Sequence, residues 1–219
     1  MTDDVLDERA WKARLDAGGN ELGIDLDSSQ LDVLWRYALL LRERNQHVNL
    51  TSIVSFEGIL TLHMLDSLTL APHLGDARRI IDVGTGGGFP GIPLAVAHPA
   101  RHFTLIDGTQ KKIRFVAESI AALDIRNAEA IAARAENFPG EKHFDVVVLR
   151  AVGMLADVLH NAARLLAPHG RILAMKGKAP DEEVRALPRG WRADVTPLRV
   201  PGLDAERHLV SLSRQKTPR

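Results

Sequence analysis

The stretch IIDVGTGGGFPGIP, residues 80–93, decides the fold of this chain. Its apolar start, residues 80–83, predicts a buried strand, and glycines follow directly at positions 84, 86, 87 and 88. From Pro90 onward the pattern becomes helical. Strand, glycine loop and helix in this order are typical of a doubly wound α/β sheet. There the loop binds a nucleotide-like ligand beyond the carboxyl end of the strand.

The glycine loop is compatible with two kinds of cofactor. Gly86, Gly88 and Gly91 satisfy the dinucleotide pattern G-x-G-x-x-G, which leaves an NAD-dependent oxidoreductase as one alternative. In the register that begins directly after the strand, at Gly84 and Gly86, the third glycine position holds Phe89. A bulky ring opposes close packing of a pyrophosphate on the helix. We therefore favour S-adenosylmethionine over NAD.

An acidic residue ends the next predicted strand, HFTLID at residues 102–107. Asp107 lies 23 residues after Gly84, close to the roughly 20 expected for a carboxylate that binds ribose hydroxyls. The alternative is that Asp107 caps the amphipathic helix predicted over residues 109–123. Both roles are compatible with each other.

Composition excludes several classes of protein. The 219 residues are 45% hydrophobic and 26% charged, which is typical of a globular chain with one main domain. The chain has no cysteine, so disulfides, thiolate metal sites and cysteine nucleophiles are absent. The start MTDDVLDE is acidic, and charged or polar residues interrupt the longest apolar runs. We expect a cytoplasmic protein with no membrane anchor.

Net charge is zero but unevenly distributed. Eight basic and thirteen acidic residues give residues 1–79 a charge of −5, and 20 basic and 15 acidic residues give residues 80–219 a charge of +5. The basic part contains the glycine loop. This asymmetry slightly favours a polyanionic substrate over an uncharged one.

The chain divides into a helical part, residues 1–78, and an α/β part, residues 79–219, which together we expect to form one compact unit. In the first part, one helix is predicted over residues 7–17 and ends at Gly18 and Gly19. A second helix begins at Ser29, with Asp32 as its capping partner, and a third lies near Glu57. In the second, strands are predicted over residues 80–83, 102–107, 128–132, 144–149 and 171–175. Residues 191–200 and 208–213, joined by a turn at Pro201 and Gly202, predict a C-terminal antiparallel hairpin at the sheet edge.

Eight ordered blocks of sequence resemble the glucose-inhibited division protein B family. They are NLTSI (49–53), HMLDSL (63–68), DVGTGGGFPGIPLA (82–95), TLIDGTQKKIRF (104–115), ARAENF (133–138), FDVVVLRAV (144–152), LAMKG (173–177) and ERHLV (206–210). The resemblance runs from about residue 28 to about residue 213. It implies a class I S-adenosylmethionine-dependent methyltransferase, Rossmann-like, that methylates N7 of a guanine in bacterial 16S ribosomal RNA. A methyltransferase of another RNA, a protein or a small molecule is the alternative.

The resemblance also implies which residues bind the cofactor. By position these are Gly84 and Phe89, the pair Ala135 and Glu136, and Arg150, to which the loop and ribose arguments add Gly86 and Asp107. Glu136 is expected to accept a hydrogen bond from the adenine amino group. Arg150, after a predicted strand, is expected to pair with a cofactor carboxylate or with RNA phosphate.

The implied partner is 16S ribosomal RNA or the small ribosomal subunit, and the protein is expected to be a monomer. Lys176, at a strand end, is the candidate for holding a phosphate or an acceptor oxygen of the RNA. Other basic residues predict a rim around the cofactor mouth: Lys111, Lys112, Arg114, Arg126, Arg134, Lys142 and Lys178. Scattered surface charge is the alternative for these. Free RNA and the assembled subunit both remain open as substrates.

His63, Asp66 and Ser67 superficially resemble a hydrolase triad. Their spacing places all three along one helical turn, whereas triads draw their members from different elements. They either hold the helical part against the sheet or line the RNA site. We expect no metal, because His98 and His102 are separated by Pro99 and the other histidines have no ligand spacing.

The acceptor atom removes the need for a catalytic base, and none is nominated. Guanine N7 has an in-plane lone pair and no proton, so alignment and exclusion of water should supply most of the acceleration. Two positions depart from the family pattern: Gly108 stands where serine is usual, and Gly87 where alanine or proline is frequent. Neither removes a charge that the chemistry needs.

Overall fold

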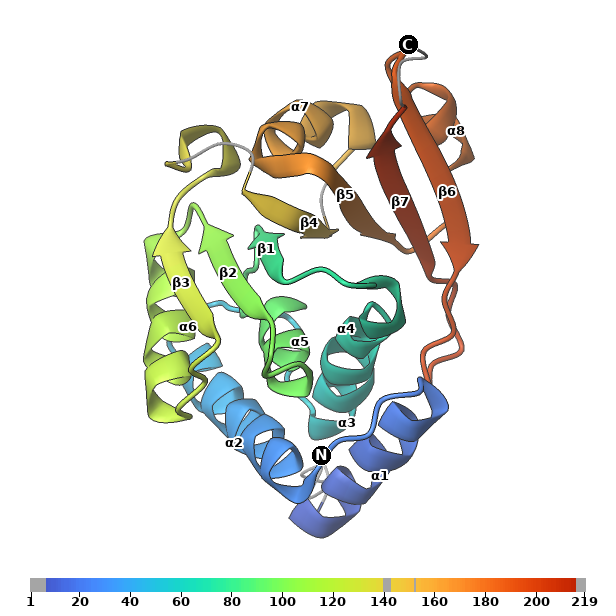
Figure 1. Cartoon of the computed structure of the whole chain (residues 1–219). Coiled ribbons are helices and arrows are strands. Elements are labelled where there is room, and N and C mark those ends of the chain that lie inside the picture. The colour runs from blue at the N-terminus through green and yellow to red at the C-terminus, as the bar shows by residue number, and fades with distance from the viewer. Residues whose placement is uncertain (1–6, 140–142, 152, 216–219) are drawn as a thin grey trace.

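A seven-stranded sheet runs through the protein in the order β3-β2-β1-β4-β5-β7-β6 (Figure 1). The computed structural model describes residues 7–139, 143–151 and 153–215. Strands β1 to β5 are parallel, and β7 is antiparallel to β5 and to β6. This confirms the predicted mostly parallel sheet with a C-terminal hairpin. The strands are β1 (Arg79–Val83), β2 (His102–Asp107), β3 (Ala128–Ala132), β4 (Phe144–Arg150), β5 (Leu166–Lys176), β6 (Trp191–Pro197) and β7 (His208–Arg214).

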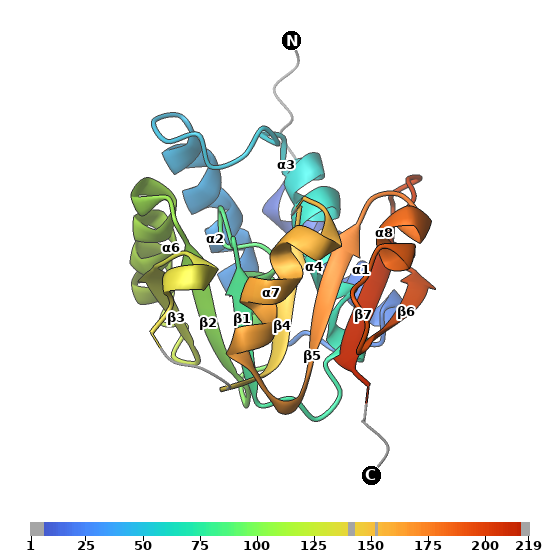
Figure 2. The same ribbon diagram turned by 90° about the horizontal axis from the view of Figure 1, so that it is seen from above.

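Helices cover both faces of the sheet. Alternate residues of a strand point to opposite sides, and in the buried strands both sets are apolar and pack against helices. Ile80 and Phe103 pack with the N-terminal helices, α5 and α6, whereas Ile81 and Ile106 pack against α7. Figures 1 and 2 show this division, with α7 and α8 opposite the N-terminal helices. The helices are α1 (Glu8–Glu21), α2 (Ser28–Asn45), α3 (Phe56–Gly58), a π-helix (Ile59–Leu65), α4 (Asp66–Leu68), α5 (Gly91–Ala97), α6 (Gln110–Ala122), α7 (Leu155–Leu165) and α8 (Asp181–Arg185), with short 3₁₀ turns at Ala71–His73 and Ala135–Asn137.

The prediction that the first helix ends at Gly18 and Gly19 is wrong. Both glycines are buried inside α1, which continues to Glu21. A Cβ atom on Gly18 would lie 2.6 Å from Cδ2 of Leu65. Glycine at this position therefore lets α1 approach the π-helix closely.

The second helix is capped by residues other than those predicted. Asp27 is the N-cap of α2, and its carboxylate accepts the Gln30 backbone N–H at 2.8 Å. The Gln30 side-chain oxygen accepts the Asp27 N–H at 2.8 Å. This completes a capping box, so the predicted Ser29–Asp32 cap is wrong by two residues.

The parallel arrangement brings the carboxyl ends of β1 to β5 to one edge of the sheet. Val83, Asp107, Arg150 and Lys176 end β1, β2, β4 and β5. From the N-terminal part, the buried Tyr37 hydroxyl of α2 donates to the Gly87 carbonyl and so fixes the glycine loop against that helix. Among the described residues, no helix is both long and apolar enough to cross a membrane.

Candidate functional site

A cavity of about 660 Å³ lies beyond the carboxyl ends of the central strands. This volume is within the range of small-molecule and cofactor sites, roughly 300–1,000 Å³. The sheet contributes the glycine loop, Asp107, Arg150 and Lys176, and the helical part contributes the opposite wall. That wall consists of Leu50, Thr51, Ser52, Ile53, Leu62, His63 and Asp66, with Arg207 from the segment before β7.

The glycine loop is held by two carboxylates. Asp82 Oδ2 accepts from Thr85 Oγ1 at 2.6 Å and from the Gly91 N–H at 2.8 Å, while Asp107 Oδ2 accepts from the Gly86 N–H at 3.0 Å. Burial raises the pKa of Asp82 to about 6, although its hydrogen bonds with Thr85 and Gly91 oppose this shift. Gly84 has φ +74°, and no atom lies within 4 Å of the place where a Cβ would stand. A ligand therefore has close access to the backbone there.

Asp107 occupies the position expected for a ribose-binding carboxylate. Its Oδ1 accepts the Thr109 N–H at 2.7 Å, and Thr109, not Asp107, is the N-cap of α6. The capping alternative is therefore wrong. Each carboxylate oxygen has a second lone pair, so acceptor capacity for hydroxyls remains. The half-buried side chain lines the large cavity and a smaller one beside it.

The smaller cavity, of about 380 Å³, contains the other predicted cofactor residues. Ala135 and Glu136 line it together with Asp107 and Arg134. The Ala135 carbonyl accepts from Arg164 Nη1 at 2.6 Å, which anchors this turn to α7. The seven predicted cofactor residues thus fall in two adjoining cavities that share Asp107, and their roles stay predictions.

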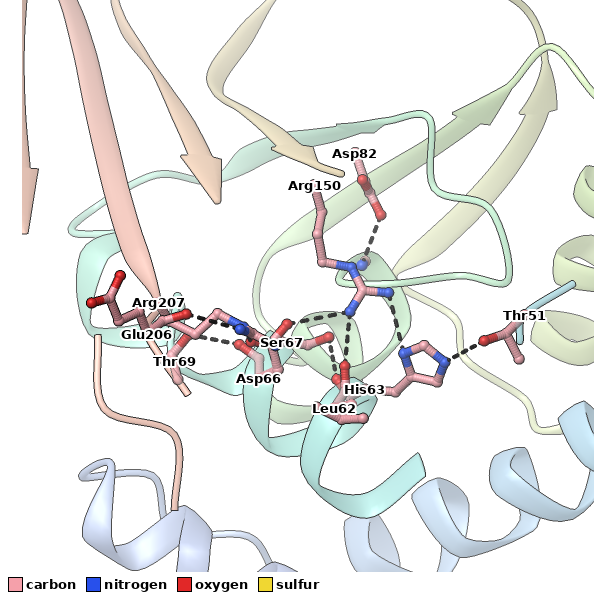
Figure 3. A network of polar contacts seen from close by, with 11 residues as sticks. Thr51, Leu62, His63, Asp66, Ser67, Thr69, Asp82, Arg150, Glu206 and Arg207 are labelled. Carbon is pink, nitrogen blue, oxygen red and sulfur yellow. Dashed lines mark hydrogen bonds and ion pairs between the residues drawn. The ribbon is translucent and has the colours of Figure 1, made fainter. Parts of the chain in front are cut away.

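Arg150 lies at the centre of a polar network (Figure 3). Its Nη1 donates to the Leu62 carbonyl at 3.2 Å and to Asp66 Oδ2 at 3.3 Å. Asp66 Oδ1 in turn accepts from Arg207 Nε at 2.9 Å. Burial lowers the pKa of Arg150, and the nearby carboxylates oppose that effect. One buried carboxylate is therefore shared by two guanidinium groups, so Asp66 neutralises only one of these two positive charges.

His63 joins this network to the glycine loop. Its ring stacks on Phe89, with centroids 4.3 Å apart and planes 12° from parallel, and the Arg150 guanidinium lies 5.4 Å from the Phe89 centroid. Burial, together with the charge of Arg150, lowers the pKa of His63 to about 3, although a Leu62 backbone contact opposes the shift. The imidazole is consequently neutral near pH 7. His63 comes from a π-helix, an irregularity that is frequent at functional sites.

Of the two roles considered for His63, Asp66 and Ser67, the structure shows the first for His63 and Asp66, which hold the helical part against the sheet, while a role in lining the RNA site stays a prediction. His63 and Asp66 connect the helical part to β4 through Arg150 and also line the large cavity. Ser67 has no exposed surface, and its hydroxyl donates to the His63 carbonyl. Ser67 therefore supports the helix without reaching the cavity.

The predicted RNA-contact residues lie in different places. Lys112 lines the large cavity and Arg134 the small one, whereas Lys111 is exposed on α6 and lines neither. Lys176 lines the large cavity, but its Nζ donates to Glu183 Oε2 at 2.8 Å and to the Gly153 carbonyl at 2.7 Å. Any RNA contact by Lys176 has to share the ammonium with these groups. Lys142 lies outside the described residues.

Tyr37, Thr51 and Arg207 are among the residues of the site that were not predicted individually. Thr51 and Arg207 lie in the NLTSI and ERHLV blocks, which signalled the resemblance without assigning roles.

In residues 7–139, 143–151 and 153–215 no group of three or more histidine, aspartate or glutamate side chains is placed to hold a metal ion.

Comparison with known proteins identifies the family. A family model described as rRNA small subunit methyltransferase G matches residues 30–210. The chain belongs to this family. A ribosomal RNA small subunit methyltransferase G of Methylococcus capsulatus is 45% identical over 199 residues, covering 90% of this chain and 96% of the relative. One of Chromobacterium violaceum is 41% identical over 204 residues, covering 93% of this chain and 98% of the relative.

Solved structures show the same fold at low sequence identity. An S-adenosylmethionine-dependent methyltransferase of Aquifex aeolicus has a TM-score of 0.55 at 17% identity and covers 72% of this chain and 93% of its own. A predicted O-methyltransferase of Agrobacterium tumefaciens has a TM-score of 0.56 at 22% identity, covering 71% and 81%. The chain therefore has the class I methyltransferase fold that the sequence predicted.

Proposed function

We propose that this protein transfers a methyl group from S-adenosylmethionine to N7 of a guanine in 16S ribosomal RNA. The observation that carries the proposal is the family match, since residues 30–210 include every residue that lines the large cavity. The name of the relatives gives the substrate class, the rRNA of the small subunit. The choice of N7 comes from the resemblance of the sequence blocks.

The chain's residues fit S-adenosylmethionine. Gly84 gives close access to the backbone, Asp107 offers a carboxylate to ribose hydroxyls, and Glu136 in the adjoining cavity offers one to the adenine amino group. Arg150 and Arg207 share one buried carboxylate, and their remaining positive charge favours a carboxylate or a phosphate. When bound, the cofactor supplies the methyl group as part of a sulfonium.

The site has the chemistry that N7 methylation needs. Guanine N7 has no proton to remove, and His63, the imidazole in the cavity wall, is neutral with its Nδ1 3.4 Å from Arg150 Nη2. This acceptor needs no general base, and the low pKa of His63 would make its imidazole a weak one. What the residues provide is alignment between rigid walls, with Phe89 held between His63 and Tyr37.

We infer that the helical part, residues 1–78, and the α/β part, residues 79–219, form one structural unit. One hydrophobic cluster contains Trp11 and Leu34 of the first helices together with Phe103 and Leu173 of the sheet. The cavity also has one wall from each part. We infer that residues 1–78 complete the site of a monomeric enzyme, which meets its ribosomal substrate in the cytoplasm.

Two measurements test the proposal. S-adenosylhomocysteine should raise the melting temperature of the protein and NADH should not, since a ligand stabilises the state it binds. The opposite result would favour an oxidoreductase. Labelled methyl should then pass from S-adenosylmethionine to small-subunit RNA lacking the modification, and not to large-subunit RNA. Label in neither RNA, with cofactor binding intact, would point to another acceptor.

A further inference from the structure

The backbone of Thr51 is fixed in the wall of the large cavity. Asn45 Oδ1 accepts the N–H of Leu50 at 2.8 Å and that of Thr51 at 3.0 Å, and Asn45 Nδ2 donates to the Thr51 carbonyl at 2.9 Å. The Thr51 side chain is half-buried and lines the cavity. Its position is therefore set by α2, before any ligand binds.

The direction of the hydrogen bond between Thr51 and His63 follows from the other ring nitrogen (Figure 3). His63 Nδ1 lies 3.4 Å from Arg150 Nη2, and a guanidinium has donors but no acceptor. Nδ1 therefore carries the lone pair, and the proton of the neutral ring is on Nε2. Nε2 lies 2.9 Å from Thr51 Oγ1, so the imidazole donates and the hydroxyl oxygen accepts.

A second donor occupies the remaining lone pair of this oxygen. The Ile53 N–H donates to Thr51 Oγ1 at 3.0 Å. With both lone pairs used, the hydroxyl acts outward only as a donor, and within the described part of the chain its hydrogen has no acceptor. Thr85, another hydroxyl of the cavity, differs because its hydrogen is committed to Asp82 Oδ2 at 2.6 Å.

We propose that the Thr51 hydroxyl donates its hydrogen to O6 of the target guanine and so selects this base. The proposal rests on the proposed function. A guanine is most often recognised by an arginine that donates to O6 and N7 together, and that contact would occupy the lone pair that receives the methyl group. A single hydrogen on a neutral donor holds O6 and leaves N7 free.

The same contact discriminates against adenine. At the position of O6, adenine carries an amino group, which is a donor. Two donors would then face each other, because Thr51 has no lone pair left to accept. Leaving both groups without a partner is more unfavourable than losing one hydrogen bond.

The test is a coupling experiment between the hydroxyl and O6. The variants are Thr51→Val, which keeps the shape without the hydroxyl, and Thr51→Ser, which keeps the hydroxyl. The substrates are small-subunit RNAs that carry guanine or 2-aminopurine, which lacks O6, at the target position. On guanine RNA we expect Thr51→Val to lower kcat/KM by roughly tenfold and Thr51→Ser to restore it. On 2-aminopurine RNA wild type and Thr51→Val should be equal.

An equal loss by Thr51→Val on both RNAs would overturn the proposal, since the effect would then come from a displaced His63. The affinity for S-adenosylhomocysteine should be unchanged in both variants. If Thr51→Val does not fold, Thr51→Ala takes its place and has to show the same dependence on O6. Failure of the proposed function has a different signature, because wild type would then form no N7-methylguanine on the guanine RNA.

Discussion

The imidazole of His63 stacks on the ring of Phe89, with centroids 4.3 Å apart. This contact joins the π-helix of the N-terminal part to the glycine loop of the sheet. Arg150, at the end of β4, approaches both rings, at 3.4 Å from His63 Nδ1 and 5.4 Å from the Phe89 centroid. The loop that is predicted to bind the cofactor is thus supported by residues that precede and follow it in sequence.

Replacing Phe89 should weaken cofactor binding. Phe89→Leu keeps most of the buried volume but removes the stack on His63, and we expect the free energy of unfolding to fall by about 1 kcal/mol. The dissociation constant of S-adenosylhomocysteine, measured by calorimetry, should rise roughly tenfold, corresponding to about 1.4 kcal/mol of lost ring contact. Affinity equal to that of wild type would contradict a role for Phe89 in binding.

Glu136 should affect binding without affecting stability. Its side chain is exposed in the smaller cavity, so Glu136→Ala should leave the melting temperature unchanged. The same variant loses one hydrogen bond to the ligand, so the affinity for S-adenosylhomocysteine should fall by roughly 3- to 10-fold. Glu136→Gln retains a carbonyl acceptor and should bind more tightly than Glu136→Ala. The neighbouring exposed Asn137→Ala is the control. If Glu136→Ala and Asn137→Ala bind alike, the adenine assignment is wrong.

The sequence predicted the sheet because strand signals are local. The apolar runs of β1, β2 and β4 need no knowledge of distant residues, and their carboxyl ends define one edge wherever the strands are parallel. Gly18 shows the limit, because its packing against Leu65, 47 positions further along, determines whether the helix continues. The partners of Arg150 could not be predicted for the same reason, since Asp66 and Arg207 meet it only in the folded chain.

Asp66 should be important for stability, since it is 4% exposed between two arginines. Asp66→Asn leaves two guanidinium groups without their carboxylate, and we expect a loss of about 3 kcal/mol in the free energy of unfolding. The control is Asp194→Asn, whose ion pair with Arg192 is exposed and should contribute less than about 1 kcal/mol. Equal losses in denaturant titrations of the two variants would show that the buried network adds nothing beyond a surface pair.

His63 should make the protein less stable in mild acid. Its pKa is about 3 in the fold against 6.5 unfolded, so the unfolded chain binds more protons between these values. The contribution of His63 to the free energy of unfolding is complete above pH 6.5 and declines as the pH falls toward 3. Between pH 6.5 and 5 the decline is about 2 kcal/mol. Asp82, whose pKa is raised from 3.8 to about 6, has the opposite dependence across that interval.

Comparison with His63→Gln isolates this contribution, because Asp82 is present in both proteins. Unfolding in urea should show a loss from pH 7 to pH 5 that is about 2 kcal/mol smaller in the variant than in wild type. Parallel pH profiles would mean that the imidazole has the same pKa in the folded protein as in the unfolded chain, which would contradict its burial without a proton.

The most direct test of the central claim is the position of the transferred methyl group. Small ribosomal subunits lacking the modification should be incubated with the protein and labelled S-adenosylmethionine, and the RNA then cleaved chemically at N7-methylguanine. We predict label at a single guanine, with cleavage at that same nucleotide. Label on another atom or another base, without cleavage at a guanine, would contradict the account.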